Sequence, residues 1–572
     1  MQRLASRIGF GLATAGAVLG LVYCQLWDDS SYGNAVSADY WGLIGDPLVI
    51  EYEAPQIYRE SRLVFTDARL DLLRPDGTAV PGYFVGSEER TVGNLFHVVY
   101  TPMSREALDL TLRFCRGPGV ALRDLDDVGE DCETHVVRVG GMTEPNALTR
   151  QRRSLETVSP MTQGETRYLM QDGQPFLKTG AGSPENILAY AGFDGTYSAG
   201  GIGFPSLGED QLHQFEAHIA DWNEGDPDWG DGAGKGIVGL FNYYESVGVN
   251  SQYMVGMNVH GDGWDVFPYV AHDDPYVFDV SKLAQWQAVL EHANRKGVAV
   301  HFLFTETENE SFFEVHDGLS VGEDFAPSRK LYYREMVARF GHLPMLVWNL
   351  GEENGVVGNT GADPYRQPTT PEQRGRFADY IASIDPHDHP IVAHNWPDAE
   401  DEVYGPLLGH TTFSGISLQA HHSYFDKVLE WTSRSADAGR PWMVSVDEPL
   451  GWEFGARPDS DVDGPREEIV TVLWPTLLAG GTGVEWYFGW QNNAPTSDLS
   501  NEDQRTRDRL WRASAKVRRF FETLPLTDMT PRREGDAMVL EGAGHRLVME
   551  GGRVRYTAPG KIEREIDPFD PR

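Results

Sequence analysis

The sequence predicts an α/β protein built around a (β/α)₈ TIM barrel, with a small β-sandwich domain before the barrel and a short C-terminal β segment after it. Two observations support this fold class. Between residues 167 and 525, short apolar runs typical of buried parallel strands alternate with stretches of helical periodicity. Between residues 39 and 140, short alternating runs are separated by turn residues, and no helical stretch is evident.

Eight strand candidates can be counted in the predicted barrel, as that fold requires. They are residues 176–180, 251–258, 298–305, 345–350, 391–396, 413–419, 442–447 and 484–488. Helical stretches lie between them, and one has apolar residues at Leu283, Trp286 and Leu290, the spacing of one helix face. Thr370-Pro371-Glu372-Gln373 combines an N-cap hydroxyl, a proline in the first turn and a Gln three residues on, which predicts a helix start. The largest insertion, 182–236, should help to cover the carboxyl end of the barrel.

The first domain, 39–140, contains strand candidates at 48–52, 63–65, 96–100 and 108–114. Cys115 and Cys132 lie within it, and in an exported protein they could form one disulfide; two unpaired thiols are the alternative. We expect this domain to brace the barrel, because it shows no row of exposed aromatic residues. A polar linker, 141–166, follows it. The tail, 526–572, has two or three weak β runs, too few for an independent domain, so it should pack on the barrel.

The amino terminus, 1–24, has basic residues followed by an apolar stretch, which predicts a signal peptide or an N-terminal anchor. Leu21-Val22-Tyr23-Cys24 resembles a lipoprotein box, although Tyr23 is bulky where a small residue is expected. The sequence therefore predicts a secreted, periplasmic or cell-surface protein of a bacterium, with lipidation as an alternative. Any membrane tether would run through this terminus only.

Composition and motifs exclude several classes of protein. A formal net charge of −38 argues against a nucleic-acid partner, because phosphate binding needs a basic surface. No dinucleotide fingerprint follows the first strand, and no Cys/His spacing of a zinc site is present, so we expect neither cofactor nor metal. The segment 226–232 faintly resembles a calcium loop, but it lacks the terminal Glu and fits a solvated acidic turn better.

Two acidic doublets close strand candidates of the predicted barrel. Glu352-Glu353 follows the fourth candidate, and Asp447-Glu448 ends the seventh. Carboxylates at the carboxyl ends of barrel strands lie on the face where these barrels place their chemistry. Glycoside hydrolysis needs two such groups, a proton donor for the leaving oxygen and a carboxylate at the anomeric carbon. At a separation of about 5–5.5 Å the reaction would retain configuration.

The barrel resembles the clan A glycoside hydrolases, which are retaining enzymes such as cellulases, β-galactosidases and agarases. In that clan the fourth strand carries Trp and then Asn-Glu, with the Glu as acid/base, and the seventh strand ends in the nucleophilic Glu. Trp348 and Glu353 match the first pattern, and Glu448 matches the second. Val484-Glu485-Trp486-Tyr487 is similar to the eighth strand. With the preceding β-sandwich, the chain resembles a bacterial group of inferred secreted glycosidases.

One position departs from the family pattern. The Asn that precedes the acid/base, and usually contacts the sugar 2-hydroxyl, is Glu352 here. Either Asn349 or Asn354 takes over that contact, or Glu352 is itself the acid/base. We favour Glu353, because strand alternation admits one member of the doublet to the site, and Glu448 over Asp447 by position. Carboxylates that only cap helices or pair with arginines are the alternative.

Further polar and aromatic residues at strand ends are candidates for sugar contacts, since hydroxyls need planar polar groups and C–H faces stack on aromatic rings. A structural role is an equally good interpretation for each. The candidates at strand ends are Asn258, His260, Asp262, Glu306, Glu308, His394, Asn395, Trp396, Gln419 and His421, and the preferred aromatic platforms are Trp264, Trp486 and Trp490.

Together these features predict an exported retaining glycoside hydrolase that cleaves a β-linked poly- or oligosaccharide by double displacement. Glu353 would be the acid/base, with a higher pKa than the nucleophile Glu448. An inactive carbohydrate-binding barrel is the main alternative, and a polysaccharide lyase is a third.

Overall fold

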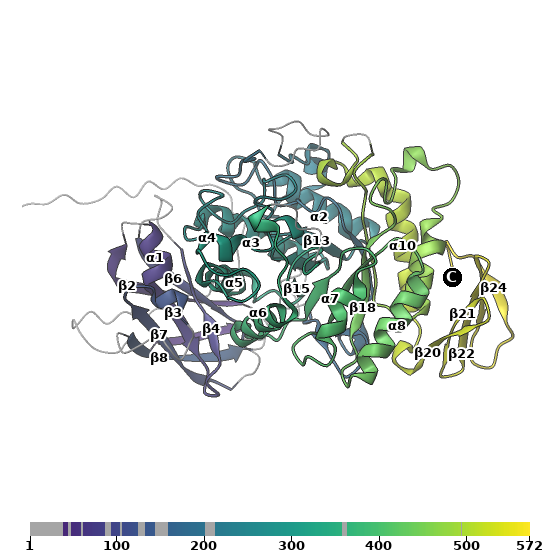
Figure 1. The fold of residues 1–572 in the computed structure, drawn as a ribbon, viewed down its shortest axis with the longest axis horizontal. Helices are drawn as coiled ribbons and strands as arrows, with labels where there is room; N and C mark the ends of the chain where they lie inside the picture. Colours follow the sequence, from purple (N-terminus) through teal and green to yellow (C-terminus); the bar gives the residue numbers. More distant parts are fainter. Residues whose placement is uncertain are drawn as a thin grey trace, which may run out of the picture.

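The structure is a computed structural model that describes residues 38–43, 47–58, 61–85, 93–102, 106–123, 132–142, 158–200, 212–356, 363–492 and 495–571. The predicted signal or anchor segment, 1–24, and most of the linker lie outside the described residues. Along the chain, the described part passes from β-sheets through a barrel to a second group of strands (Figure 1).

The barrel is closed by eight parallel strands in the order of the sequence, and β12 pairs with β19. All eight predicted strands are confirmed, each within a few residues of its expected bounds. The strands are β12 (Lys178–Ala181), β13 (Ser251–Val255), β14 (Ala299–Leu303), β15 (Leu346–Asn349), β16 (Ile391–His394), β17 (Gly415–Ala420), β18 (Met443–Pro449) and β19 (Gly483–Trp486). Every one of their residues is buried, as expected for strands with helices on one side and a packed interior on the other.

Helices surround the barrel, and their ends follow from local sequence. They are α2 (Lys235–Val247), α3 (Val280–Arg295), α4 (Phe312–His316), α5 (Pro327–Phe340), α6 (Pro371–Ile384), α7 (Glu400–Tyr404), α8 (Tyr424–Asp437), α9 (Trp474–Leu478) and α10 (Asp508–Phe521). The predicted start of α6 is confirmed: the Thr370 hydroxyl accepts the Gln373 N–H at 3.2 Å, and the Gln373 side chain accepts the Thr370 N–H at 3.1 Å. A small sheet of β9 (Thr162–Gln163), β10 (Leu169–Gln171) and β11 (Gln174–Pro175) packs Met161 and Leu169 against Val347 and Met443 of the barrel.

Two sheets precede the barrel. One has the order β1-β8-β7-β3-β4 and the other β2-β6-β5, and all pairs are antiparallel except β1 with β8. Their strands are β1 (Ala38–Leu43), β2 (Leu48–Tyr58), β3 (Ala68–Leu73), β4 (Ala79–Pro81), β5 (Tyr83–Phe84), β6 (Gly93–Tyr100), β7 (Leu108–Arg116) and β8 (Cys132–Met142). The rings of Phe96 and Phe114, one from each sheet, lie 5.4 Å apart, so the sheets share an apolar core.

The expectation that this region has no helix is wrong. The run at 63–65 lies in α1 (Ser61–Asp67), where Val64 and Phe65 are buried. A run of three apolar residues has no measurable period, so it fits a short helix as well as a strand.

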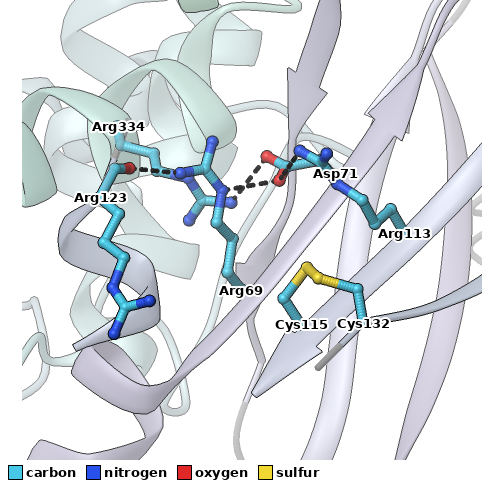
Figure 2. The surroundings of a disulfide bond; sticks show 7 residues. All are labelled: Arg69, Asp71, Arg113, Cys115, Arg123, Cys132 and Arg334. Atoms are coloured by element: carbon cyan, nitrogen blue, oxygen red, sulfur yellow. Dashed lines mark hydrogen bonds and ion pairs between the residues drawn. A yellow bond between two sulfur atoms is a disulfide. The ribbon is translucent and has the colours of Figure 1, made fainter. Parts of the chain in front are cut away.

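Cys115 and Cys132 form a disulfide between the paired strands β7 and β8 (Figure 2).

In the same view, the Asp71 carboxylate of β3 lies among three guanidinium groups: Arg69 at 2.7 Å, Arg113 at 3.4 Å and Arg334 at 3.2 Å. Burial opposes ionisation of Asp71, but the arginines outweigh it and lower the pKa of that carboxyl. Arg334 belongs to α5, so this ion pair joins the first domain to the barrel.

The C-terminal segment forms an antiparallel sheet of β20 (Thr530–Glu534), β21 (Ala537–Gly542), β22 (His545–Glu550), β23 (Arg553–Thr557) and β24 (Arg564–Ile566). The three expected runs are β21, β22 and β23; the polar runs β20 and β24 were not expected. The Phe520 ring of α10 contacts Tyr556 at 5.4 Å, and Arg533 pairs with Asp426 of α8 at 2.6 Å. The sheet therefore packs on the barrel, as predicted. Within the described ranges, none of the helices combines the length and apolar character needed to cross a bilayer.

Candidate active site

The first acidic doublet lies in a strained turn after β15. The strand ends at Asn349, and Glu353 has a φ of +49°, in the left-handed region that costs free energy for a residue other than Gly. Hydrogen bonds hold the turn in place: the Glu352 N–H donates to the Thr305 carbonyl at 2.9 Å, and the Glu353 N–H donates to His394 Nδ1 at 3.0 Å. Because the chain has left the strand, simple alternation no longer decides which member of the doublet faces the barrel axis.

The second doublet lies within β18, opposite an irregularity in the pairing with β17. Leu418 is paired with Val446, but Gln419 is paired with Glu448, so Asp447 is the extra residue of a bulge. Both Asp447 and Glu448 are buried, at 0% and 7% exposure. The bulge places two consecutive carboxyl groups inside the barrel, one below the other.

The two doublets converge at the carboxyl end of the barrel. One carboxylate oxygen of Glu352, one of Glu448 and a ring nitrogen of His394 all lie within 4.8 Å of one another. Glu353 is more exposed than Glu352, and its carboxyl lies against the Gln419 side chain. Both members of the first doublet are close enough to Glu448 to affect its ionisation.

His394 has a defined tautomer. Its Nδ1 accepts the Glu353 N–H, and burial lowers the pKa of His394 to about 3, so the ring is neutral and carries its hydrogen on Nε2. That nitrogen lies 3.5 Å from Glu448 Oε2, and neither atom has another hydrogen-bond partner among the described residues. The His394 Nε2–H therefore lies beside the Glu448 carboxyl, where its partial positive charge favours the ionised form of that carboxyl.

An ion-pair network fills the barrel beneath these groups. Lys178 Nζ lies 2.8 Å from Asp447 and 3.1 Å from Glu485, and His301 Nδ1 lies 2.8 Å from Glu485. Asn349 joins the network, since its side-chain amide donates to His301 Nε2 at 3.0 Å. Asp447 therefore has a structural role, since it pairs with Lys178 inside the barrel.

The carboxyl groups at the barrel mouth raise one another's pKa. Burial, and then the charges of Asp498 and Asp262, raise the pKa of Glu352 to about 8, although a hydrogen bond from the Tyr253 hydroxyl at 3.0 Å opposes the shift. Burial and the charge of Glu352 raise the pKa of Glu353 well above its usual value. Burial, and then the charges of Glu352 and Glu353, also raise the pKa of Glu448. At neutral pH the Glu352 carboxyl is therefore protonated, and the raised pKa of Glu353 is in the direction that a general acid needs.

Several predicted contact residues have structural partners. The Asn258 side chain donates to the Asp262 carbonyl and accepts the N–H groups of Asp265 and Val266, which orders the loop after β13. Asn354 donates to the Thr305 hydroxyl at 3.1 Å, and Glu308 pairs with Arg366. The Asn395 side chain bonds Tyr404 and the backbone of Gln419.

The predicted aromatic platforms differ in position. Trp486 is fully buried, and its indole N–H donates to Ser514 of α10 at 3.0 Å, so the ring lies between barrel and helices rather than at the mouth. Trp264 and His260 are half-buried beside each other, and the His260 ring stacks on Tyr365 at 4.0 Å. Trp490 and His421 are also half-buried.

The segment 226–232 is tied down by hydrogen bonds within the chain. Asp226 accepts the Asn242 side chain at 2.7 Å, and Asp228 accepts the Gly234 N–H at 3.1 Å. The groups of convergent ligand atoms found among the described residues do not include these aspartates.

Sequence reasoning missed Glu185, Tyr253 and Asp498, which surround Glu352. Glu185 and Asp498 lie in long loops with no local pattern that marks them. Trp452 and Phe454, 50% and 40% exposed on the loop after β18, were also missed. Two aromatic residues shortly after the predicted seventh strand could have indicated candidates for sugar stacking.

Comparisons with solved structures support the fold. No protein-family model and no curated protein matches the chain. A "putative glycoside hydrolase" of Bacteroides vulgatus aligns at 13% identity with a TM-score of 0.52, over 90% of this chain and 84% of that chain. A family 5 glycoside hydrolase of the same organism aligns at 13% identity and a TM-score of 0.45, over 72% and 89%. A xyloglucanase of Bacteroides ovatus aligns at 11% identity and a TM-score of 0.34, over 84% and 98%. The first alignment shows a shared fold, and at this identity it shows nothing more.

Proposed function

We propose that this protein is a glycoside hydrolase that cleaves a β-linked poly- or oligosaccharide with retention of configuration. The observation that carries the proposal is the convergence of Glu352, in the turn after β15, with Glu448 of β18 at the carboxyl end of a closed barrel. One protonated and one ionised carboxyl at this face are what double displacement needs. The shared fold with a protein described as a glycoside hydrolase agrees with it.

Glu448 is the proposed nucleophile. Its Oε2 lies 3.5 Å from His394 Nε2, and a small movement of the ring would bring this N–H into hydrogen bonding with the ionised carboxylate as it attacks the anomeric carbon. When Glu448 bonds to that carbon, the glycosidic bond breaks and the leaving oxygen takes a proton from the acid/base. Water, deprotonated by the same acid/base, then releases the sugar.

Glu353 is the proposed acid/base. It is more exposed than Glu352, so a leaving group and then a water can approach it, and the Gln419 side chain lies beside it. Glu352 is only 8% exposed and accepts the Tyr253 hydroxyl. We assign Glu352 to a position deeper in the site, next to Glu448.

Screening against aryl β-glycosides and β-linked polysaccharides should first identify a substrate. The Glu448→Ala variant should then be inactive, and azide should restore turnover with an α-glycosyl azide as product. The Glu353→Ala variant should lose on the order of 10²–10⁴-fold in activity on poor leaving groups, and azide should give the β-glycosyl azide. Full activity of Glu448→Ala would refute the mechanism. Azide rescue of Glu352→Ala, with none for Glu353→Ala, would move the acid/base to Glu352.

Export is a further part of the proposal. The basic and apolar residues at 1–24 support secretion or attachment at the bacterial cell surface. Fractionation of expressing cells, with mass spectrometry of the mature amino terminus, should give a chain cleaved near Cys24, and a lipid on that cysteine would identify a lipoprotein. Recovery of the intact chain in the cytoplasm would contradict export.

A further inference from the structure

Three clusters of potential ligand atoms occur among the described residues, and two of them are poor candidates for a metal site. In the first cluster, Asp447 and Glu485 pair with the ammonium group of Lys178, and His301 contacts Glu485. In the cluster of Glu352, His394 and Glu448, the imidazole nitrogen that faces the carboxylates carries a hydrogen, so it is unable to bind a metal. The third cluster is formed by Glu185, Glu306 and Glu352, and one carboxylate oxygen of each lies within 4.8 Å of the others.

No cation balances this third cluster in the part of the chain that the structure describes. None of the described Lys, Arg or His side chains forms an ion pair with Glu185, Glu306 or Glu352. The three carboxyl groups are 5%, 2% and 8% exposed, so water provides little compensation. Buried carboxylates without a counter-charge are costly, so such groups either take up protons or bind a metal. Burial and the neighbouring acidic groups raise the pKa of Glu185 and of Glu306 well above the usual value, and a bound cation would reverse that shift.

The fold fixes the carboxylates of Glu306 and Glu352 and the backbone of Glu185. Glu306 follows β14, and its Oε1 accepts the Asp262 N–H at 2.8 Å. Gly261 makes room for it, because a Cβ at that position would lie 1.3 Å from Glu306 Oε1. Glu352 is oriented by the Tyr253 hydroxyl. The loop after β12 is anchored at Glu185, whose carbonyl accepts the Val255 N–H at 3.0 Å.

Asp498 supplies an independent sign of a missing ligand. It is fully buried, and its Oδ1 lies 3.4 Å from the Glu185 N–H, which places this carboxylate beside the cluster. Its Oδ2 has no hydrogen-bond partner among the described residues. A fully buried carboxylate oxygen without a donor is rare in native proteins and indicates an absent ion or water.

We propose that Glu185, Glu306 and Glu352 bind a divalent cation that prefers oxygen ligands, Ca²⁺ or Mg²⁺, and that the neighbouring Asp498 adds negative charge beside the site. The donor set contains no thiolate and no imidazole, which argues against zinc or copper. Several carboxylates around one point are the ligands that Ca²⁺ prefers. The cation would lie next to Glu352 and would offset negative charge beside Glu448. The site itself requires no hydrolase activity.

Isothermal titration of the chelator-treated full chain with CaCl₂, and separately with MgCl₂, tests the proposal without any substrate. We expect about one ion per chain with a dissociation constant between about 10⁻⁷ and 10⁻⁴ M, and a higher unfolding temperature when the ion is present. Glu306→Gln and Glu185→Gln should each weaken binding at least tenfold. Gly261→Ala keeps every charge but displaces the Glu306 carboxylate, so it should weaken binding as well.

Glu308→Gln is the matched control, because Glu308 lies two residues from Glu306 but pairs with Arg366, and this variant should bind as the wild type does. Absence of binding to both ions at millimolar concentration would overturn the proposal. Equal binding by wild type and a Glu185→Gln/Glu306→Gln double variant would overturn it too. If glucosamine oligomers bind and neither metal does, the cluster recognises a sugar amine instead. Failure of the glycosidase assays leaves all these results unaffected.

Discussion

The buried carboxyl of Asp385 holds β15, the strand that precedes the first acidic doublet, and its removal should lower stability in a pH-dependent way. This residue follows α6, is 5% exposed, and accepts the indole N–H of Trp348 in β15 at 2.9 Å. Its two oxygens also lie 2.8 and 3.0 Å from His389 Nδ1. Burial alone would raise the pKa of Asp385, but His389 and the hydrogen bonds lower it to about 2.

The shift in the pKa of Asp385 gives the contribution of this carboxyl to the free energy of unfolding. The pKa falls from 3.8 to about 2 on folding, and at ~1.36 kcal/mol per unit this corresponds to about 2.5 kcal/mol. Since the folded pKa is the lower one, this stability is complete above about pH 5 and is lost as the pH falls toward 2. The free energy of unfolding of the Asp385→Asn variant should therefore be about 2.5 kcal/mol lower than that of the wild type at pH 6. This difference should become smaller at pH 3.

Urea unfolding followed by tryptophan fluorescence at pH 6, 5, 4 and 3 measures this difference. Other carboxyl groups titrate in both proteins and cancel. Asp379→Asn, on the exposed side of α6, is the control and should change stability by less than about 0.5 kcal/mol. A deficit of Asp385→Asn that stays constant from pH 6 to pH 3 would show that the carboxyl has no lowered pKa, and the reasoning would fail.

Three further changes test other parts of the structure. Lys178→Met leaves Asp447 and Glu485 buried without their cation and should lower stability by roughly 3–5 kcal/mol; an unchanged melting temperature in calorimetry would contradict the ion-pair network. Cys132→Ala removes a disulfide across a separation of 17 residues and should cost about 3 kcal/mol, whereas equal urea midpoints for variant and wild type would mean that the bond is dispensable. Trp452→Ala removes an exposed ring after β18 and should raise KM about three- to tenfold without changing the melting temperature; an unaltered KM would exclude Trp452 as a sugar platform.

The barrel was predictable because its strands are buried on both faces. Such strands appear as short apolar runs, and the runs kept their order and number in the folded chain. The position of Glu448 at the end of the seventh strand, and of the Glu352-Glu353 doublet after the fourth, followed from those runs. The apolar run of each strand was enough to locate its carboxyl end, and therefore the acidic residues that follow it.

The fine geometry of the site was not predictable in the same way. The bulge at Asp447 and the left-handed turn at Glu353 both break the alternation on which sequence reasoning relies. Glu185 and Asp498 reach Glu352 only through tertiary folding of distant loops. Lys178 and Glu485, by contrast, are charged residues inside or next to strand candidates, and they could have indicated a paired network within the barrel.

The contact between Arg334 and Asp71 makes the first domain an integral part of the folded protein rather than a detachable module. Arg339 of the same helix also donates to the Phe84 carbonyl at 2.8 Å, and Phe65 packs on Phe278 at 5.3 Å. Cutting the chain after the two sheets would expose the Phe278 ring. It would leave Arg334 without its acceptors in the first domain and would leave Arg339 with Glu335 but without the Phe84 carbonyl. Melting of the sheets and of the barrel should accordingly proceed as one cooperative event, and barrel variants should be prepared with the amino-terminal sheets in place.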